Sequence, residues 1–415
     1  MFETDNPFLT GSALEALSEW SNELKTFQSR IGQSFARSEA RQSAFDYLQA
    51  LMSPVERKNG WQMAEQVGHQ TPYQFQHLLG RAQWDADEVT QEVRQYVTEG
   101  LGREDGILAV DESGFIKQGN HSVGVQVQHC SLTGRLENCQ VGVFLAYVNP
   151  HGHSLIDRRL YLPQSWCHDA DKRTKAGVPE GVEFATKPQL AKQMLKVAFE
   201  AGIRPRWVVA DEVYGNDGKF WWWLEQHYQQ PYLLTVASSH HVFIGYQEHR
   251  VKDLAQALPN EQWQRLSCGD GTKGERIYDW ARIGVNCSNE HDMKRWILLR
   301  RNIEKLDDPL SVTYYQVYAP ANTTLEEMVL VAGQRWRIEE CFAIAKDKLG
   351  LSQYEVRSWV GWHRHMTLVM AAQAFLTVLR HQVEPIPVPK KSLPGNGKTR
   401  SSMDAFKVAR GLLSH

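Results

Sequence analysis

The spacing of apolar residues along the chain differs between the N-terminal part and the rest. In the N-terminal part apolar side chains recur every three or four residues, as in 45–52, which is the spacing of an α-helix with one buried face. The pattern predicts further helices over 55–67 and 73–79, with Gly68 ending the first of these two. We therefore expect residues 1–104 to form an all-α N-terminal domain.

Two of these helices have the spacing of a helix-turn-helix unit. Ala64 and Gly68 are separated by one helical turn, and the Thr-Pro pair at 71–72 is a favourable start for the helix that follows. On that helix Gln74 and Arg81 are candidate contacts to DNA bases and phosphates. Ordinary packing of helices explains the same pattern equally well, so both interpretations stay open at this point.

Strand-like patterns begin at residue 106. Valines alternate with polar residues over 122–130, the run 141–148 is mostly apolar, and turn residues separate the two, so these runs predict an antiparallel meander after the apolar run 107–110. A helix, a fourth strand and a further helix are predicted next, over 187–201, 207–210 and 220–227. This order predicts an α/β (α+β) fold with an RNase H-like catalytic core, whose first part spans 105–235.

A long connection interrupts this core. The 127 residues between Asp211 and Glu339 exceed what one connection within a sheet needs, which predicts an insertion. We expect a β-rich insertion domain over 236–322 and a return to core helices over 323–382. The insertion contains four β-type runs, at 242–246, 277–285, 296–300 and 312–318.

Three carboxylates have the setting of a metal site. Asp111 and Asp211 each follow a short apolar run that reads as a buried strand, and Glu339 lies on a predicted helix. At about 100° per residue, Arg335, Glu339 and Lys346 fall within roughly 40° of one another beside the apolar face of that helix. Three carboxylates can hold two divalent ions for phosphoryl transfer. Taken singly, each aspartate is also a common strand end, and the helix is also a common surface helix with ion pairs.

The same residues carry a family resemblance. Arg335, Glu339 and Lys346 match the signature of DDE transposases of the insertion-sequence-four group, which reads tyrosine, two residues, arginine, three residues, glutamate, six residues and lysine. Ala332 stands at the tyrosine position, so that element is missing. The runs VDESGF at 110–115, VVADEVYGND at 208–217 and GLSQYEVRSW at 350–359 resemble the insertion-sequence seven-oh-one family, a close relative. The resemblance covers roughly residues 40 to 380.

The resemblance implies a transposase that moves an insertion sequence by cut-and-paste. It implies two Mg²⁺ ions, with Mn²⁺ as a substitute, held by Asp111, Asp211 and Glu339, and phosphate contacts from Arg335 and Lys346. The implied partners are double-stranded DNA, as terminal inverted repeats and target, and a second copy of the chain in a synaptic homodimer. A tryptophan of the insertion stacks on DNA in that group, and the candidates in this chain are Trp263, Trp280 and Trp296.

Charge and composition change this picture only in part. The formal net charge of −2 argues against strong contact with phosphates, but residues 335–415 carry 13 positive and 6 negative charges. Lys390 and Lys391 lie in a Pro/Gly/Ser-rich segment, 383–415, that we expect to be a flexible basic tail with or without DNA as its partner.

Cysteine spacing and hydropathy bear on the compartment. The six cysteines lack CxxC spacing, which favours reduced thiols over a structural zinc site. No apolar run is long enough for a membrane span, so we expect no membrane partner and a location in the cytoplasm of a bacterium, near the nucleoid.

Two other classes of protein fit the same features. One is an RNase H-like DNA nuclease that cleaves without strand transfer. The other is a non-catalytic DNA-binding protein derived from a transposase, although three retained carboxylates argue against it.

Overall fold

A computed structural model describes residues 11–102, 105–271, 274–287, 292–306 and 311–383. The chain divides into two compact units. The helical unit comprises Met1–Leu101 and Ala343–His415, and the sheet unit comprises Gly102–Phe342. Among the described helices, none is both long and apolar enough to cross a membrane.

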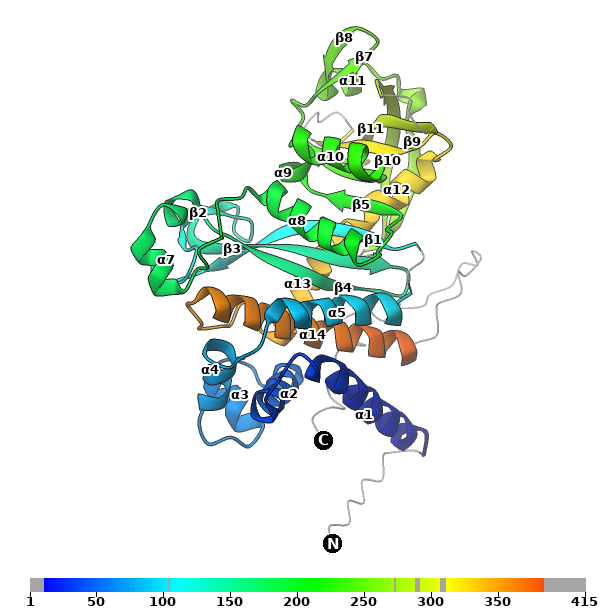
Figure 1. The fold of residues 1–415 in the computed structure, drawn as a ribbon. Coiled ribbons are helices and arrows are strands. Elements are labelled where there is room, and N and C mark those ends of the chain that lie inside the picture. Colours follow the sequence, from blue (N-terminus) through cyan, green and yellow to red (C-terminus); the bar gives the residue numbers. More distant parts are fainter. Residues whose placement is uncertain (1–10, 103–104, 272–273, 288–291, 307–310, 384–415) are drawn as a thin grey trace. The chain divides into compact units, whose positions relative to one another are not determined.

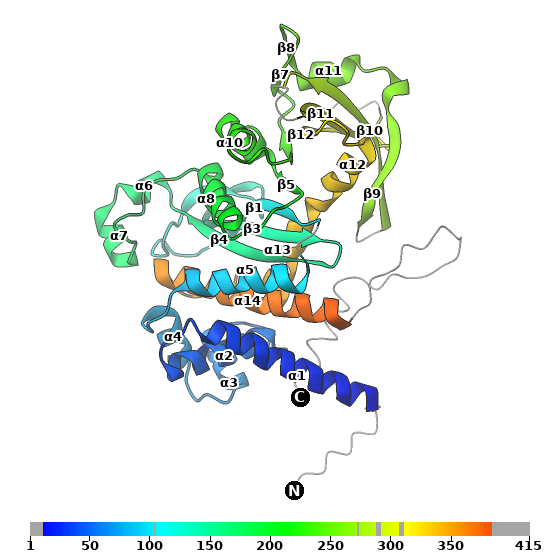
Figure 2. The same ribbon diagram turned by 45° about the vertical axis from the view of Figure 1, so that its right-hand side comes forward.

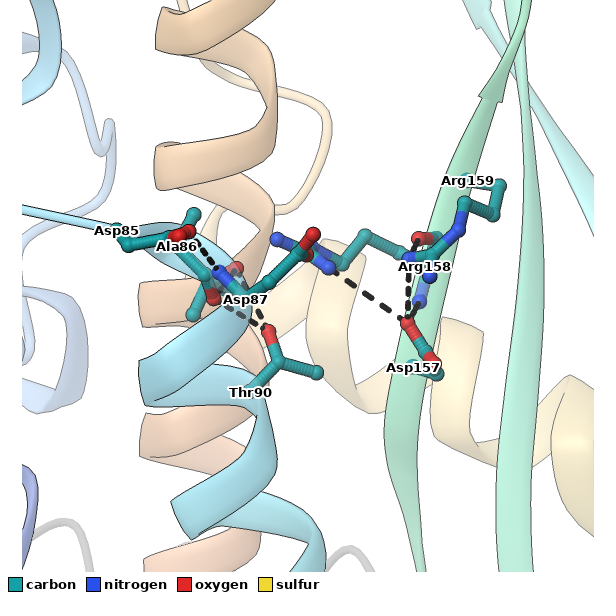
Figure 3. Close-up of polar contacts among 8 residues, drawn as sticks. Asp85, Ala86, Asp87, Thr90, Asp157, Arg158 and Arg159 are labelled. Carbon is teal, nitrogen blue, oxygen red and sulfur yellow. Dashed lines mark hydrogen bonds and ion pairs between the residues drawn. The ribbon is translucent and has the colours of Figure 1, made fainter. Parts of the chain in front are cut away.

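The helical unit is built from helices that come from both ends of the sequence (Figure 1). They are α1 (Gly11–Gly32), α2 (Ser38–Met52), α3 (Gly60–Gln66), α4 (Tyr73–Gly80), α5 (Ala86–Gly100) and α14 (Trp359–Val383). Helices α5 and α14 lie side by side, and the hydroxyls of Thr90 and Thr367 are 3.2 Å apart between them (Figure 2). The start of α5 is capped by Asp85, whose Oδ1 accepts a hydrogen bond from the backbone N–H of Asp87 at 2.8 Å (Figure 3). The buried residues of α5 and α14 are mostly apolar, so the core of this unit joins segments far apart in the sequence.

The region predicted as a helix-turn-helix unit differs from expectation at one end. The helix expected over 55–67 begins only at Gly60, because the side chain of Asn59 accepts a hydrogen bond from the backbone N–H of Gln62 and caps the helix there. Gly68 adopts a φ of 84° and ends this segment, as predicted. Helix α4 also lies where expected, and both Gln74 on this helix and Arg81 at its C-cap are exposed. Their contact with DNA stays a prediction.

The sheet unit contains the core predicted from the order of elements. Its strands are β1 (Ile107–Ile116), β3 (Arg135–Asn149), β4 (Gly152–Tyr161), β5 (Trp207–Ala210) and β6 (Tyr232–Val236). Strands β1, β3 and β4 pair antiparallel, whereas β5 is parallel to both β1 and β6. The resulting order β4-β3-β1-β5-β6 is that of an RNase H-like sheet, which confirms the predicted fold class.

The meander itself differs from the prediction in its third strand. The run expected as a full strand over 122–130 forms only the short β2 (Gln126–Cys130), which pairs with the outer part of β3. The third strand of the core is β4, which bulges next to Asp157. Asp157 is fully buried, and its Oδ1 accepts hydrogen bonds from the backbone N–H of Arg158 at 2.7 Å and from Arg159 Nη1 at 3.0 Å (Figure 3). The sequence did not predict β4, because the three consecutive charged residues 157–159 interrupt the apolar pattern of a buried strand.

Helices and inserted strands complete the sheet unit. The helices between the core strands are α6 (Gln164–Cys167), α7 (Ala170–Ala176), α8 (Lys187–Glu200), α9 (Glu212–Gly215) and α10 (Gly218–Tyr228). The insertion contributes β7 (His241–Ile244), β8 (Gln247–Arg250), α11 (Val251–Ala257), β9 (Gln264–Gly271), β10 (Gly274–Val285), β11 (Met293–Arg301) and β12 (Val312–Pro320). Strand β12 pairs antiparallel with β6, so β9 to β12 extend the core sheet (Figures 1 and 2). Helix α12 (Leu325–Gln334) follows, and then α13 (Trp336–Leu349).

Candidate active site

Two neighbouring parallel strands bring Asp111 and Asp211 together. In the pairing of β1 with β5, Val110 lies opposite Ala210. Asp111 directly follows the first of these residues and Asp211 directly follows the second. Strand β5 ends there, and Asp211 becomes the N-cap of α9, with its Oδ1 accepting from the backbone N–H of Val213 at 3.0 Å. The sequence predicted that β1 also ends at its aspartate, but β1 continues to Ile116 through its pairing with β3. The site therefore lies beside the middle of β1, where its parallel neighbour stops.

A third carboxylate joins the two aspartates. Oxygen atoms of Asp111, Glu112 and Asp211 all lie within 4.8 Å of one another. Glu112 was not among the predicted site residues, because neighbours in a strand normally point to opposite faces. The signal available in the sequence was the acidic pair itself, directly after a buried apolar run.

Burial and mutual repulsion raise the pKa of both aspartates in this cluster. Burial raises the pKa of Asp111 well above its usual range, the charges of Asp211 and Glu112 add to the rise, and Arg335 opposes it. Burial and the charge of Glu112 raise the pKa of Asp211 to about 6, against opposing effects of the Val213 N–H, Arg335 and Lys187. The cluster is an electrostatically unfavourable set of anions that a bound cation would stabilise.

The donor set fits a divalent metal ion. Carboxylate oxygens at this spacing are the ligands that Mg²⁺ and Ca²⁺ prefer, whereas the nitrogen and sulfur ligands typical of zinc are not part of the cluster. Asp111 and Asp211 would hold such an ion, and Glu112 faces the same space.

Arg335 links this cluster to Glu339. Its Nη1 lies 3.9 Å from Asp111 Oδ2, and its Nη2 donates to Glu339 Oε1 at 2.8 Å. The predicted single helix through Arg335 is divided, because α12 ends at Gln334 and α13 starts at Trp336. Glu339 thus adjoins the three clustered carboxylates through a guanidinium, and its role as a metal ligand stays a prediction. Lys346 lies further along α13, and its contact with phosphate is likewise a prediction.

Glu340 has partners of its own. Helix geometry places it about 100° around from Glu339, away from Arg335 and Lys346, and its side chain is nevertheless only 15% exposed. Its Oε2 accepts from Arg337 Nη1 at 2.7 Å and lies 3.6 Å from His153 Nε2. The two adjacent glutamates of α13 therefore contact different arginines, and only Glu339 shares its arginine with Asp111.

The three candidate tryptophans of the insertion differ in accessibility. Trp280 is fully buried and Trp296 is 7% exposed, so both belong to the core and neither presents a ring face to DNA. This corrects the prediction for these two, because packing between the strands covers the rings. Trp263 is partly buried, with the guanidinium of Arg301 4.3 Å from its ring centroid. It remains the candidate of the three for stacking. Lys390 and Lys391 lie outside the described residues.

Residues 30–255 match the family model described as DDE superfamily endonuclease. The chain is 23% identical over 319 residues to a protein of Microchaete diplosiphon named "Probable transposase for insertion sequence element IS701", and the match covers 75% of this chain and 76% of that protein. Among solved structures it is similar to the piggyBac transposase synaptic complex with hairpin DNA, with a TM-score of 0.48 and 12% identity, over 96% of this chain and 79% of that one.

Proposed function

This chain belongs to the DDE superfamily endonucleases, and we propose that it is the transposase of an insertion sequence. The membership confirms the expected relationship to DDE enzymes. The observation that carries the proposal is the convergence of Asp111 and Asp211, at the ends of paired segments of β1 and β5, beside Arg335 and Glu339. The relative from the insertion element supports the same function.

We infer that the substrate is double-stranded DNA at the ends of the element. Asp111, Asp211 and Glu339 would hold two divalent ions, Mg²⁺ or Mn²⁺, and such ions would supply activation of the attacking oxygen and neutralisation of charge on the leaving oxygen. Arg335, held between Asp111 and Glu339, donates hydrogen bonds to a non-bridging phosphate oxygen, and Lys346 contacts a neighbouring phosphate.

The proposed reaction has two steps at phosphorus. In the first, water forms a bond to the phosphorus at an element end, and the bond from phosphorus to the 3′-oxygen breaks, leaving a free 3′-hydroxyl and a 5′-phosphate. In the second, that 3′-oxygen attacks a phosphorus of target DNA and displaces the target's own 3′-oxygen, which takes up a proton. Synapsis of the two ends implies at least a homodimer during the reaction.

A strand-transfer assay tests this function. The purified full chain is incubated with Mg²⁺, a target plasmid and linear donor DNA carrying the inverted repeats that flank its gene. We expect cleavage at the ends and donor DNA joined to target, and neither product with Asp211→Asn. Cleavage without joining would instead identify a nuclease, and end binding without cleavage would identify a DNA-binding protein that lacks catalysis.

A further inference from the structure

Glu112 is held in a specific position by two other elements of the sheet unit. Its carboxylate is almost completely buried, with Lys187 Nζ donating to Oε1 at 2.5 Å and Tyr214 Oη donating to Oε2 at 3.1 Å. Tyr214 lies on α9 directly after Asp211 and is fully buried. Each oxygen of Glu112 thus has one hydrogen-bond donor that fixes the plane of the carboxylate.

The position of Lys187 is itself fixed by local structure. Lys187 is the first residue of α8, and its neighbour Thr186 forms a capping box with Gln189 at that helix end. The lysine therefore approaches Glu112 from a rigid helix start. A mobile surface lysine would not aim a buried carboxylate in this way.

The orientation of Glu112 places its carboxylate beside two other carboxylates, which is unfavourable unless a cation binds between them. One of its oxygens lies within 4.8 Å of carboxylate oxygens of both Asp111 and Asp211, and Lys187 supplies the cation that pairs with Glu112 itself. Holding a third anion against two others destabilises the folded chain. Such an arrangement is typical of a binding site for a cation.

We propose that Glu112 is a carboxylate ligand of the metal centre and that Lys187 and Tyr214 are positioning residues that aim it at Asp111 and Asp211. The proposal rests on the proposed function in one respect, namely that a divalent ion binds at the two aspartates. Glu112 would then be a ligand in addition to Glu339, and it would come from the same strand as Asp111. A hydrogen-bonded second layer that orients ligands is a general feature of metal sites.

Metal binding without DNA tests the proposal. Mn²⁺ is titrated into the full-length chain and free Mn²⁺ is followed by electron paramagnetic resonance. We expect Glu112→Gln to weaken Mn²⁺ binding by about a hundredfold, and Tyr214→Phe to weaken it by about tenfold, the range seen when partners of a ligand are removed. The matched control is Glu212→Gln, which alters an exposed glutamate next to Asp211 and should bind Mn²⁺ like the unaltered chain.

Stability supplies the second readout. In a chelator, Glu112→Gln should change the melting temperature only modestly, because relief of one of three crowded charges opposes the loss of the ion pair with Lys187, and the amide oxygen still accepts from Tyr214. Mn²⁺ should then raise its melting temperature less. If Glu112→Gln does not fold, Glu112→Asp keeps the charge, shortens the side chain and should still weaken Mn²⁺ binding.

Two results of the Mn²⁺ titration distinguish failure of the Glu112 proposal from failure of the proposed function. If Glu112→Gln binds Mn²⁺ as tightly as the unaltered chain while Asp211→Asn does not bind it, Glu112 is only the ion-pair partner of Lys187 and the inference fails alone. If Asp211→Asn also binds Mn²⁺ normally, the metal centre is elsewhere and the proposed function loses its basis.

Discussion

At the scale of single residues, adjacent carboxylates have different surroundings in two places. Asp111 and Glu112 are neighbours in β1 yet converge on one cluster, whereas Glu339 and Glu340 are neighbours in α13 yet contact different arginines. Helix geometry accounts for the second difference, since adjacent helical residues are about 100° apart. The sequence did not predict the first, because the simple alternation of a strand places neighbours on opposite faces.

The two glutamates of α13 give a sharp comparison of matched substitutions. Glu339→Gln should lower the rate of end cleavage by orders of magnitude, because it removes the charge of the proposed metal ligand and of the partner of Arg335, and each 1.36 kcal/mol lost at the transition state is about tenfold in rate. Glu340→Gln should leave cleavage within about tenfold, although it weakens the contact with Arg337 and lowers stability by about 1 kcal/mol. Single-turnover cleavage of both variants decides; a dead Glu340→Gln beside an active Glu339→Gln would reverse the assignment.

At the scale of elements, the insertion helps to place Arg335. Helix α12 packs against β9 of the insertion, with Gly333 in close contact with the backbone of Cys268. Arg276 donates to the carbonyl oxygens of Cys268 and Gly333, at 3.2 and 3.1 Å. Arg335 follows directly at the end of α12. The inserted strands were predictable as β-type runs, but their pairing with β6 and with α12 was not, because it depends on contacts between distant parts of the chain.

Gly333→Ala tests this contact. A Cβ at this position would lie 2.0 Å from the carbonyl oxygen of Cys268, so α12 or β9 must shift. We expect the free energy of unfolding to fall by about 1–3 kcal/mol, as for other overpacked sites, and end cleavage to fall with it as Arg335 moves. The matched control is Gly80→Ala in α4, where a Cβ meets nothing within 4 Å and higher helix propensity should leave stability equal or raised. Denaturant unfolding of both variants measures the difference, and equal stabilities would show that the helix adjusts without cost.

At the scale of the whole molecule, the crowded carboxylates of the candidate site make the stability of the folded chain depend on pH. Folding raises the pKa of Asp211 from its ordinary value of 3.8 to about 6, so the folded chain holds a proton there that the unfolded chain has already released. Between these two pH values the folded state binds more protons than the unfolded state. Stability contributed by that proton is complete below pH 4 and is lost as the pH rises through 6.

Melting experiments in a chelator measure this dependence. As pH rises from about 4 to about 6.5, the melting temperature of the unaltered chain should fall relative to that of Asp211→Asn, whose amide does not titrate. Comparing the two chains cancels the contribution of carboxylates elsewhere. Adding Mn²⁺ above pH 6 should raise the melting temperature of the unaltered chain relative to that of Asp211→Asn again, because the ion replaces the lost proton. Parallel curves for the two chains throughout this range would mean that Asp211 titrates normally.

The pairing of β6 with β12 also bears on how the chain is made. Residues 237–311 lie between the two strands in the sequence, so β12 leaves the ribosome well after β6. At about 5–20 residues per second, synthesis of this stretch takes on the order of ten seconds, during which one edge of β6 has no partner from the chain. An unpaired edge invites pairing with other chains. A messenger truncated within the insertion would therefore yield a product that carries both candidate aspartates, Asp111 and Asp211, and aggregates through the open edge of its sheet.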